Sequence, residues 1–340
     1  MEPYKITLAC RNYDRTAAII HGQVKPSGVD LEVTQIDRPR LLFTRMFNGE
    51  FDVAEFSFAE HVYYTSRDNS DFIAIPVFPS KIFRHSFIFL NTSSKIERPE
   101  DLEGKRIAFV EWVQTAAIWI RGTLVEEYNI SPKNTGWYAP QLHHWDTGGG
   151  KDEVKPRDGT TIHWLEKNGK DPFDILDSAL VERKVDAIGT LVLPNSFLKG
   201  GKGIKRLFEN YRDEEMSYFK KTRIFPIMHI LVARKSVVEQ HPDLARKLFE
   251  LFVQSKRMGQ EKLKRDLSLS IVWKNPYLDE EEKVFQGDPW AYGLKRNSHV
   301  VEKFLTYCYN QGVSARKMSP RDLFVPDTWD LTEESIPTRS

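Results

Sequence analysis

Two strand-like stretches of the chain each carry one histidine, the side chain best suited to move a proton near neutral pH. They are Phe83-Arg84-His85-Ser86 and Pro226-Ile227-Met228-His229. A lone histidine in a strand is more often a core residue bonded to the backbone, so that alternative stays open for both. Neighbouring residues point to opposite faces of a strand. We therefore expect His85 to face a ligand in preference to Arg84, which stays a secondary binding candidate.

Two arginines occupy the turn after the first predicted strand, in Cys10-Arg11-Asn12-Tyr13-Asp14-Arg15. Ligands of open α/β sheets bind outside the carboxyl ends of the strands, and a following helix presents backbone N–H groups that favour anions. Arg11 and Arg15 together suit a carboxylate, because guanidinium groups bind such groups in a bidentate way. The alternative is a pair of surface arginines bridged to Asp14.

A second anion-binding turn is expected at Glu111-Trp112-Val113-Gln114-Thr115, between a predicted strand and a predicted helix. Thr115 can cap that helix, and Glu111 and Gln114 lie where a ligand would meet the end of the strand. Alternatively, these residues only stabilise the turn and bind no ligand. Three weaker candidates also lie at or just beyond the ends of predicted strands: Glu55, Ser57 and Asn195.

The elements that must position these residues alternate between strands and helices. Alternating or continuous apolar stretches predict strands at 5–10, 31–36, 51–56, 72–78, 106–110 and 186–190. Helices are expected between them, and two long amphipathic helices at 241–269 and 297–311. The alternation predicts an α/β fold in which a mostly parallel sheet is flanked by helices.

The length of 340 residues favours two lobes, because a single core rarely grows to that size. The strand-like runs at 81–90 and 224–234 are interpreted as two crossover strands that form a hinge. Lobe 1 is then discontinuous, 1–85 and 228–340, and lobe 2 covers 86–227. Ligands favour such interfaces, so we expect the ligand in a cleft between the lobes.

Composition excludes several classes of partner. The net charge of +1 argues against nucleic acid or an anionic membrane as the main partner, and no stretch reaches the length of a membrane span. The N-terminus shows no signal peptide, which predicts a cytoplasmic protein. Cys10 and Cys308 are expected as buried thiols. His143, His144 and His163 form only a weak metal-site candidate in a polar loop.

Several stretches together resemble the signature runs of the 4,5-dihydroxyphthalate decarboxylase family. The resemblance covers roughly residues 4–327 and is weakest at 143–170. Its fold is similar to that of type II periplasmic solute-binding proteins, so the resemblance implies that fold here. The matching runs are Ala9-Cys10-Arg11-Asn12-Tyr13-Asp14-Arg15, Phe83-Arg84-His85-Ser86, Thr115-Ala116-Ala117-Ile118-Trp119-Ile120-Arg121-Gly122 and Phe225-Pro226-Ile227-Met228-His229, with further matches at 49–53, 73–79 and 292–294.

The resemblance implies a carboxy-lyase that converts 4,5-dihydroxyphthalate to protocatechuate without oxidation. The leaving carboxylate must then be held out of the ring plane, and the ring carbon must receive a proton. We expect the two arginines of the first turn and the helix N-terminus at Thr115 to anchor carboxylates. Either His85 or His229 is the acid and the other binds a hydroxyl, while Glu111 orients a catechol hydroxyl.

Two other functions fit the same fold: a binding module for an aromatic acid, or another small-acid lyase such as a chorismate dehydratase. No cofactor is expected, although Glu111 with the two histidines leaves a divalent metal open. The expected partner is a small aromatic carboxylate, and a homo-oligomer is considered. Release of CO2 from the dihydroxyphthalate would separate the enzyme from the binding module.

Overall fold

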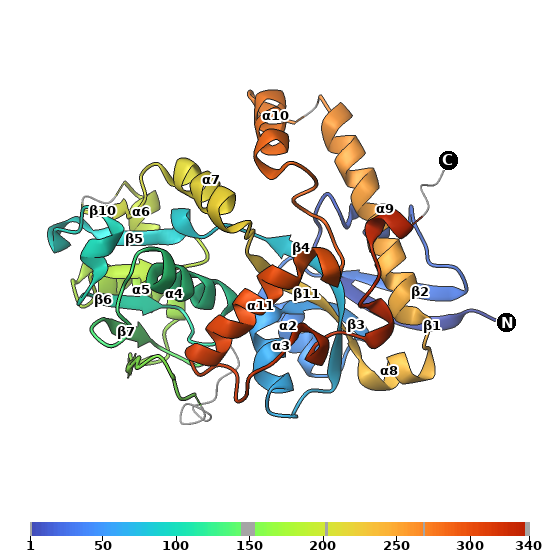
Figure 1. Cartoon of the computed structure of the whole chain (residues 1–340), viewed down its shortest axis with the longest axis horizontal. Helices are drawn as coiled ribbons and strands as arrows, with labels where there is room; N and C mark the ends of the chain where they lie inside the picture. Colours follow the sequence, from blue (N-terminus) through green and yellow to red (C-terminus); the bar gives the residue numbers. More distant parts are fainter. Residues whose placement is uncertain (1, 144–153, 201–202, 268, 337–340) are drawn as a thin grey trace.

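The computed structural model describes residues 2–143, 154–200, 203–267 and 269–336, and it contains two mixed sheets with helices around them (Figure 1). The first sheet has the strand order β2-β1-β3-β11-β4. Its first three strands pair in parallel, and β11 runs antiparallel to both of its neighbours. Its strands are β1 (Tyr4–Cys10), β2 (Val29–Gln35), β3 (Val53–Ser57), β4 (Phe72–Lys81) and β11 (Ile227–Arg234).

The second sheet has the order β10-β5-β9-β6-β7-β8. Strands β9, β6, β7 and β8 pair in parallel, whereas β5 is antiparallel to both of its neighbours. Its strands are β5 (Ile88–Asn91), β6 (Arg106–Phe109), β7 (Gly136–Ala139), β8 (Ile162–Trp164), β9 (Ala187–Gly189) and β10 (Ile204–Arg206). We call the parts built on the two sheets the first and the second lobe.

In each sheet one strand runs against all the others, and it is the strand that receives the chain from the other lobe. The chain leaves the first sheet after β4 and enters the second as β5; it returns from the second lobe into β11. The predicted α/β fold of two lobes, each mostly parallel and joined by two crossings, is therefore confirmed.

One expectation about the first crossing is wrong. The stretch 81–90 is not one strand, because β4 ends at Lys81 and a 3-10 helix over His85–Phe87 precedes β5. Arg84 and His85 therefore do not alternate between two strand faces, and both side chains are buried. The prediction that His85 faces a ligand in preference to Arg84 assumed a strand here, so it loses its basis.

The helices fill the space between and around the sheets, and none that the structure describes is both long and apolar enough to cross a bilayer. Helix α10 and the start of α11 were not expected, and the helix expected between the strands at 5–10 and 31–36 is only one turn long. The helices are α1 (Ala17–Ile20), α2 (Pro39–Phe47), α3 (Phe58–Thr65), α4 (Thr115–Glu127), α5 (Pro172–Val181), α6 (Asn195–Leu198), α7 (Tyr211–Thr222), α8 (Lys235–Gln240), α9 (Leu244–Arg265), α10 (Lys274–Phe285) and α11 (Leu294–Asn310).

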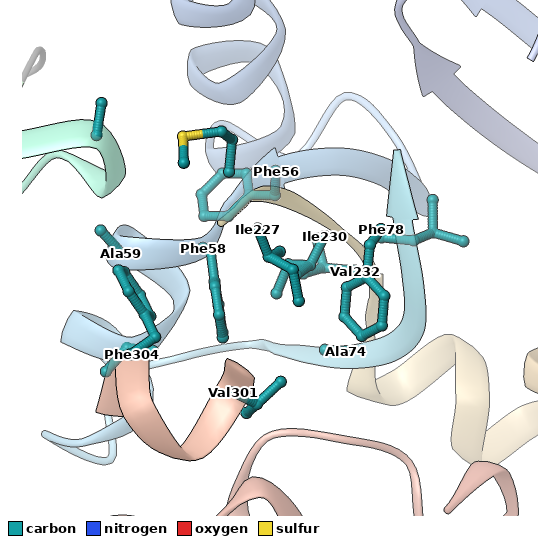
Figure 2. Close-up of a cluster of buried hydrophobic side chains, with 14 of the residues drawn as sticks. Phe56, Phe58, Ala59, Ala74, Phe78, Ile227, Ile230, Val232, Val301 and Phe304 are labelled. Atoms are coloured by element: carbon teal, nitrogen blue, oxygen red, sulfur yellow. The ribbon is translucent and has the colours of Figure 1, made fainter. Parts of the chain in front are cut away.

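The first core surrounds β11, which is buried from Ile227 to Ala233 except at His229. Figure 2 shows apolar side chains of β3, α3, β4 and α11 packed around this strand. The ring of Phe304 on α11 stacks on that of Phe58, with 4.4 Å between centroids. His229 is therefore the one partly exposed polar residue within the buried apolar part of this inner strand.

Helices α4 and α11 join the two lobes near the hinge. A Cβ atom at Gly122 of α4 would lie 2.2 Å from Cδ2 of Tyr307 on α11, so only glycine allows this close approach. The indole Nε1 of Trp119 donates to the carbonyl of Ile227, 2.9 Å away, at the start of β11. Cys10 and Cys308 are both buried and free, as expected.

Candidate functional site

Glu55 and His229 form a hydrogen-bonded pair on two neighbouring inner strands of the first sheet. Strands β3 and β11 are antiparallel with His229 opposite Ser57, which places Glu55 diagonally across on the same face. Nδ1 of His229 lies 2.6 Å from Oε1 of Glu55; the carboxylate is fully buried and the imidazole is 15% exposed. This bond fixes the ring orientation and leaves Nε2 as the nitrogen available to a ligand.

The strand that carries His229 is irregular at this point. The register between β4 and β11 shifts on both sides of His229. Strand β4 contains Pro76 and Pro79, and proline lacks the N–H group that a regular ladder needs. Such irregularities re-aim side chains, and they are common beside binding sites.

Tyr13 and Arg11 complete the surroundings of the carboxylate. The phenol of Tyr13 donates to Oε1 of Glu55 at 2.7 Å, and the backbone N–H of Arg11 donates to Oε2 at 3.1 Å. Burial raises the pKa of Glu55, but the hydrogen bonds and charge of His229 with these two donors outweigh it, so the pKa is lowered. Glu55 is therefore an anion at neutral pH.

The guanidinium of Arg11 is only partly engaged. Its Nη1 donates to the Tyr13 hydroxyl at 2.9 Å, while its buried Nε has no hydrogen-bond partner among the described residues. A buried N–H group without a partner is costly, so this donor is suited to a ligand oxygen. Burial and the charge of Glu55 raise the pKa of Tyr13, which keeps the phenol protonated.

Arg15 is a packing residue in this structure. Its Nε donates to the carbonyl of Pro79 at 2.6 Å, and its Nη1 bridges to Asp14 at 3.0 Å. The guanidinium lies over the rings of Tyr13, at 4.1 Å, and Trp290, at 3.9 Å. The bridge to Asp14 agrees with the structural alternative for Arg15, although the side chain is buried and not on the surface.

Glu111 faces the first lobe from the second. Its Oε1 accepts from Nη2 of Arg40 on α2 at 2.5 Å and from the amide of Gln141 at 3.0 Å. Its Oε2 accepts from the amide of Gln114 at 3.3 Å. Glu111 is buried, so the Arg40–Glu111 ion pair is a partly desolvated contact between the two lobes.

The N-termini of α3 and α4 meet between the lobes. The hydroxyl groups of Ser57 and Thr115 lie 3.4 Å apart, and the backbone N–H of Ala59 donates to Oγ1 of Thr115 at 3.0 Å. Thr115 was expected to cap its own helix, but it instead satisfies an N–H group of α3. Two helix N-termini that face one place create a positive potential there, which favours an anion.

His85 lies elsewhere, in the second lobe among aromatic rings. Its ring centroid is 5.2 Å from that of Phe208 and 5.3 Å from that of Tyr218. Neither ring nitrogen has a hydrogen-bond partner within the described ranges, and burial lowers the pKa of His85 to about 4. Arg84 donates to the sulfur of Met228 at 3.3 Å, and burial lowers its pKa to about 9.

The remaining candidates are not part of this group. Asn195 is exposed in the first turn of α6, which Figure 1 places at the outer end of the second lobe. His163 stacks on Tyr138, His143 is buried near two tyrosine rings, and His144 lies outside the described residues. No group of three metal-ligating side chains is found among the residues that the structure describes.

The comparisons with known proteins address the whole chain. The 4,5-dihydroxyphthalate decarboxylase of Comamonas testosteroni is 31% identical over 331 residues, which are 96% of this chain and 98% of that protein. The chain belongs to the 4,5-dihydroxyphthalate decarboxylase family. A second relative of that name, from Pseudomonas putida, is 33% identical over 138 residues, 40% of this chain and 53% of that protein.

Comparison with solved structures shows that this member of the decarboxylase family has the fold of periplasmic binding proteins. Residues 11–149 match the family model of the periplasmic substrate-binding protein of phosphonate ABC transporters. The aliphatic sulphonate binding protein SsuA of Escherichia coli aligns with a TM-score of 0.51 and 11% identity, over 96% of this chain and 99% of that one. The sulfonate-binding protein SsuA of Methylobacillus flagellatus gives 0.55 and 14%, over 96% and 93%. At such identities the likeness shows the fold alone.

Four residues near the site of this decarboxylase family member were missed as candidates. Tyr13 lies in the first turn between the two arginines, so its position was visible but its role was not. Arg40 and Gln141 reach Glu111 from elements far away in the sequence. Glu60 is buried in the first turn of α3, where burial raises its pKa well above the usual value. The one sequence signal for Glu60 is the pattern of a capping Ser followed three residues later by Glu, which is typical of a helix start.

Proposed function

We propose that this protein removes one carboxylate from 4,5-dihydroxyphthalate without oxidation and releases CO2 and protocatechuate. Similarity to the Comamonas testosteroni decarboxylase over nearly the whole of both chains supports the reaction class. The observation that carries the mechanism is the pair of Glu55 and His229, an ionised carboxylate bonded to a partly exposed imidazole. Such a pair holds the imidazole in a fixed orientation, with its other nitrogen free to act on a ligand.

In this reaction the bond between the ring carbon and the leaving carboxylate breaks, and its electron pair stays on the ring carbon. That carbon then takes a proton, so one CO2 leaves and one proton is consumed. His229 is the proposed donor: its Nδ1–H stays bonded to Glu55 while Nε2–H gives its proton. The neutral imidazole regains a proton from water before the next turnover.

The residues proposed to bind the substrate carboxylates are distinct from the residue proposed to transfer the proton. Arg11 offers a buried N–H donor without a partner in the described ranges, next to the Glu55–His229 pair. The meeting N-termini of α3 and α4, with Ser57 and Thr115, favour a second anionic group. A substrate with two neighbouring carboxylates matches two such places, whereas Arg15 is already held by Asp14 and two rings.

Glu111 is proposed as a positioning residue. Its two oxygens are occupied by Arg40, Gln114 and Gln141, so its direct contact is with the protein. Through Arg40 it holds the first lobe against the second. The proposed consequence is that Glu111 supports closure over the substrate, and that it acts on the reaction through this closure.

The test is a discontinuous assay of purified protein with 4,5-dihydroxyphthalate. Protocatechuate is measured by chromatography, and CO2 is measured from the same sample. We expect wild type to form the two products in equal amounts. We expect His229→Gln to form them far more slowly and His85→Gln to form them at close to the wild-type rate. A saturable rise in melting temperature without CO2 would identify a binding protein and contradict the proposal. Absence of both signals would also contradict it.

A further inference from the structure

The ends of α9 and α10 project from the first lobe, away from both sheets (Figure 1). The short connection between them exposes large apolar side chains, led by Leu267 at 91% and Val272 at 86%. We call six of these residues the apolar tip: Leu267, Leu269, Ile271, Val272, Trp273 and Tyr277. An exposed set of this kind within so few residues is uncommon on a monomer, where such side chains are usually scattered singly.

The apolar tip is a built part of the fold. Nζ of Lys274, in the first turn of α10, donates to the carbonyl of Leu263 at 3.0 Å and to that of Asp266. These bonds satisfy carbonyls at the end of α9 and fix the angle between the two helices. On its other side α10 is attached to α7, where the rings of Phe285 and Phe219 are 4.2 Å apart.

The size of the apolar tip fits one half of a contact between proteins. The exposed fractions of its six side chains correspond to several hundred Å² of apolar surface. A typical monomer has a largest patch of about 300–600 Å², and each partner of a standard interface contributes about 800 Å². The tip with its polar rim therefore suits an interface.

Charges of opposite sign lie on the two sides of the apolar tip. The last turns of α9 expose three basic residues, Lys262, Lys264 and Arg265, and one acidic residue, Glu261, so this side is basic in sum. Helix α10 exposes three acidic residues, Asp279, Glu281 and Glu282, and one basic residue, Lys283, so this side is acidic in sum. A surface with an apolar centre, a basic side and an acidic side is complementary to itself when it is turned by a two-fold rotation.

We propose that the apolar tip is a contact between two copies of this chain. In the pair, the tips pack on each other, and the basic end of α9 in one copy faces the acidic side of α10 in the other.

The first experiment measures the mass of the full chain by sedimentation across a micromolar range of concentration. Wild type is expected to be a dimer or a larger even-numbered assembly. The variant Val272→Ser with Trp273→Ser is expected to sediment as a smaller species. The matched control is Val181→Ser with Leu198→Ser, which removes exposed apolar groups of the second lobe and should leave the mass unchanged.

The second experiment exchanges charges and does not depend on the apolar substitutions. Reversing Lys262, Lys264 and Arg265 to Glu should weaken association, and so should reversing Asp279, Glu281 and Glu282 to Lys. Mixing the two variants should restore a mixed pair, because the acidic α9 and α10 of one variant then face the basic α10 and α9 of the other at both charge contacts. The combined variant, with both sets reversed, should restore association fully, because complementarity returns.

Three results would overturn this proposal. The first is a monomeric wild type over the whole concentration range. The second is an unchanged mass in both the serine and the charge-reversed variants, with circular dichroism showing that they are folded. The third is a monomer that binds neutral phosphatidylcholine vesicles through the tip, which would assign the surface to lipid.

Discussion

Nδ1 of His229 lies 2.6 Å from the buried Oε1 of Glu55, although the two residues are far apart in the sequence. The pair exists because β11, the strand on which the chain returns, is placed between β3 and β4. The same strand order brings the turn with Arg11 and Tyr13 to this carboxylate. A return crossing of the chain thus assembles the candidate site.

Replacing His229 by Gln should lower turnover by about 100- to 10,000-fold, the range typical for loss of a general acid or base. His85→Gln is the matched control and should keep turnover within a few-fold of wild type, because His85 contacts aromatic rings of the second lobe. Steady-state assays of protocatechuate formation check both. If the two variants exchange these effects, the proton donor is assigned to the wrong histidine.

Glu55→Gln should lower turnover by about 10- to 100-fold while the substrate still binds. The reason is that a neutral amide holds the His229 ring in place less firmly than the carboxylate does. The variant should also change the response to acid. The pKa of Glu55 is lowered in the folded state, so its stabilisation is present above about pH 4.3, the usual Glu value, and is lost as pH falls through the lowered value. Urea unfolding of the two proteins at neutral and acid pH measures this. An equal loss of stability in both would contradict it.

Replacing Arg40 by Ala should destabilise the fold by about 1–3 kcal/mol, because buried Glu111 loses its ion-pair partner in the other lobe. The low end of that range is expected, since Arg40 is 34% exposed and its ion pair is partly screened. Glu111→Gln should cost less, and the double variant should cost less than the sum of the two. Additive effects in urea unfolding would show that the pair is not coupled. The KM of Arg40→Ala should rise if the pair supports closure.

His85→Phe should be tolerated and should make the protein more resistant to mild acid. The folded pKa of His85 is about 4, against about 6.5 for an unfolded histidine. Between these values the unfolded chain takes up a proton that the folded chain does not, so wild type loses about 2–3 kcal/mol as pH falls from 6.5 to 4. The Phe variant lacks this loss. Melting temperatures at pH 7 and pH 5 check it, and equal shifts in the two proteins would contradict it.

The fold could be predicted from the sequence to a large extent, because its signals are local. Apolar alternation located β1 and β3, and Pro39 marked the start of α2. The prediction of a single strand at 81–90 was wrong, and the reason is also local. A continuous apolar run does not distinguish a strand from a strand that ends, turns over His85–Phe87 and begins again.

The site was harder to predict, because its contacts depend on which strands become neighbours. Arg11, Glu55, Ser57 and Thr115 were found by their places at strand ends, and His229 was found as a histidine within an apolar run. The structure brings these residues to one region. The pairing of Glu55 with His229 was not foreseen. Periodicity gives the face of a side chain, but it does not give the order of strands in a sheet.

Some residues gave a misleading signal for the same reason. Asn195 follows a strand of the second sheet, yet it lies on an exposed turn. Arg40 carried no signal at all, because its partner Glu111 belongs to the other lobe. Contacts between lobes are set by how two complete sheets face each other, and this arrangement is not encoded in any one segment.

The hydrogen bond from the Ala59 N–H to Thr115 has a consequence for affinity. A ligand carboxylate that takes this N–H group must displace the threonine hydroxyl, so binding there exchanges one hydrogen bond for another. The net gain in affinity is then small. Such a binding site selects its ligand by charge and shape but binds it weakly. That suits rapid release of a product that resembles the substrate, and it would be a poor design for a protein that scavenges a scarce solute.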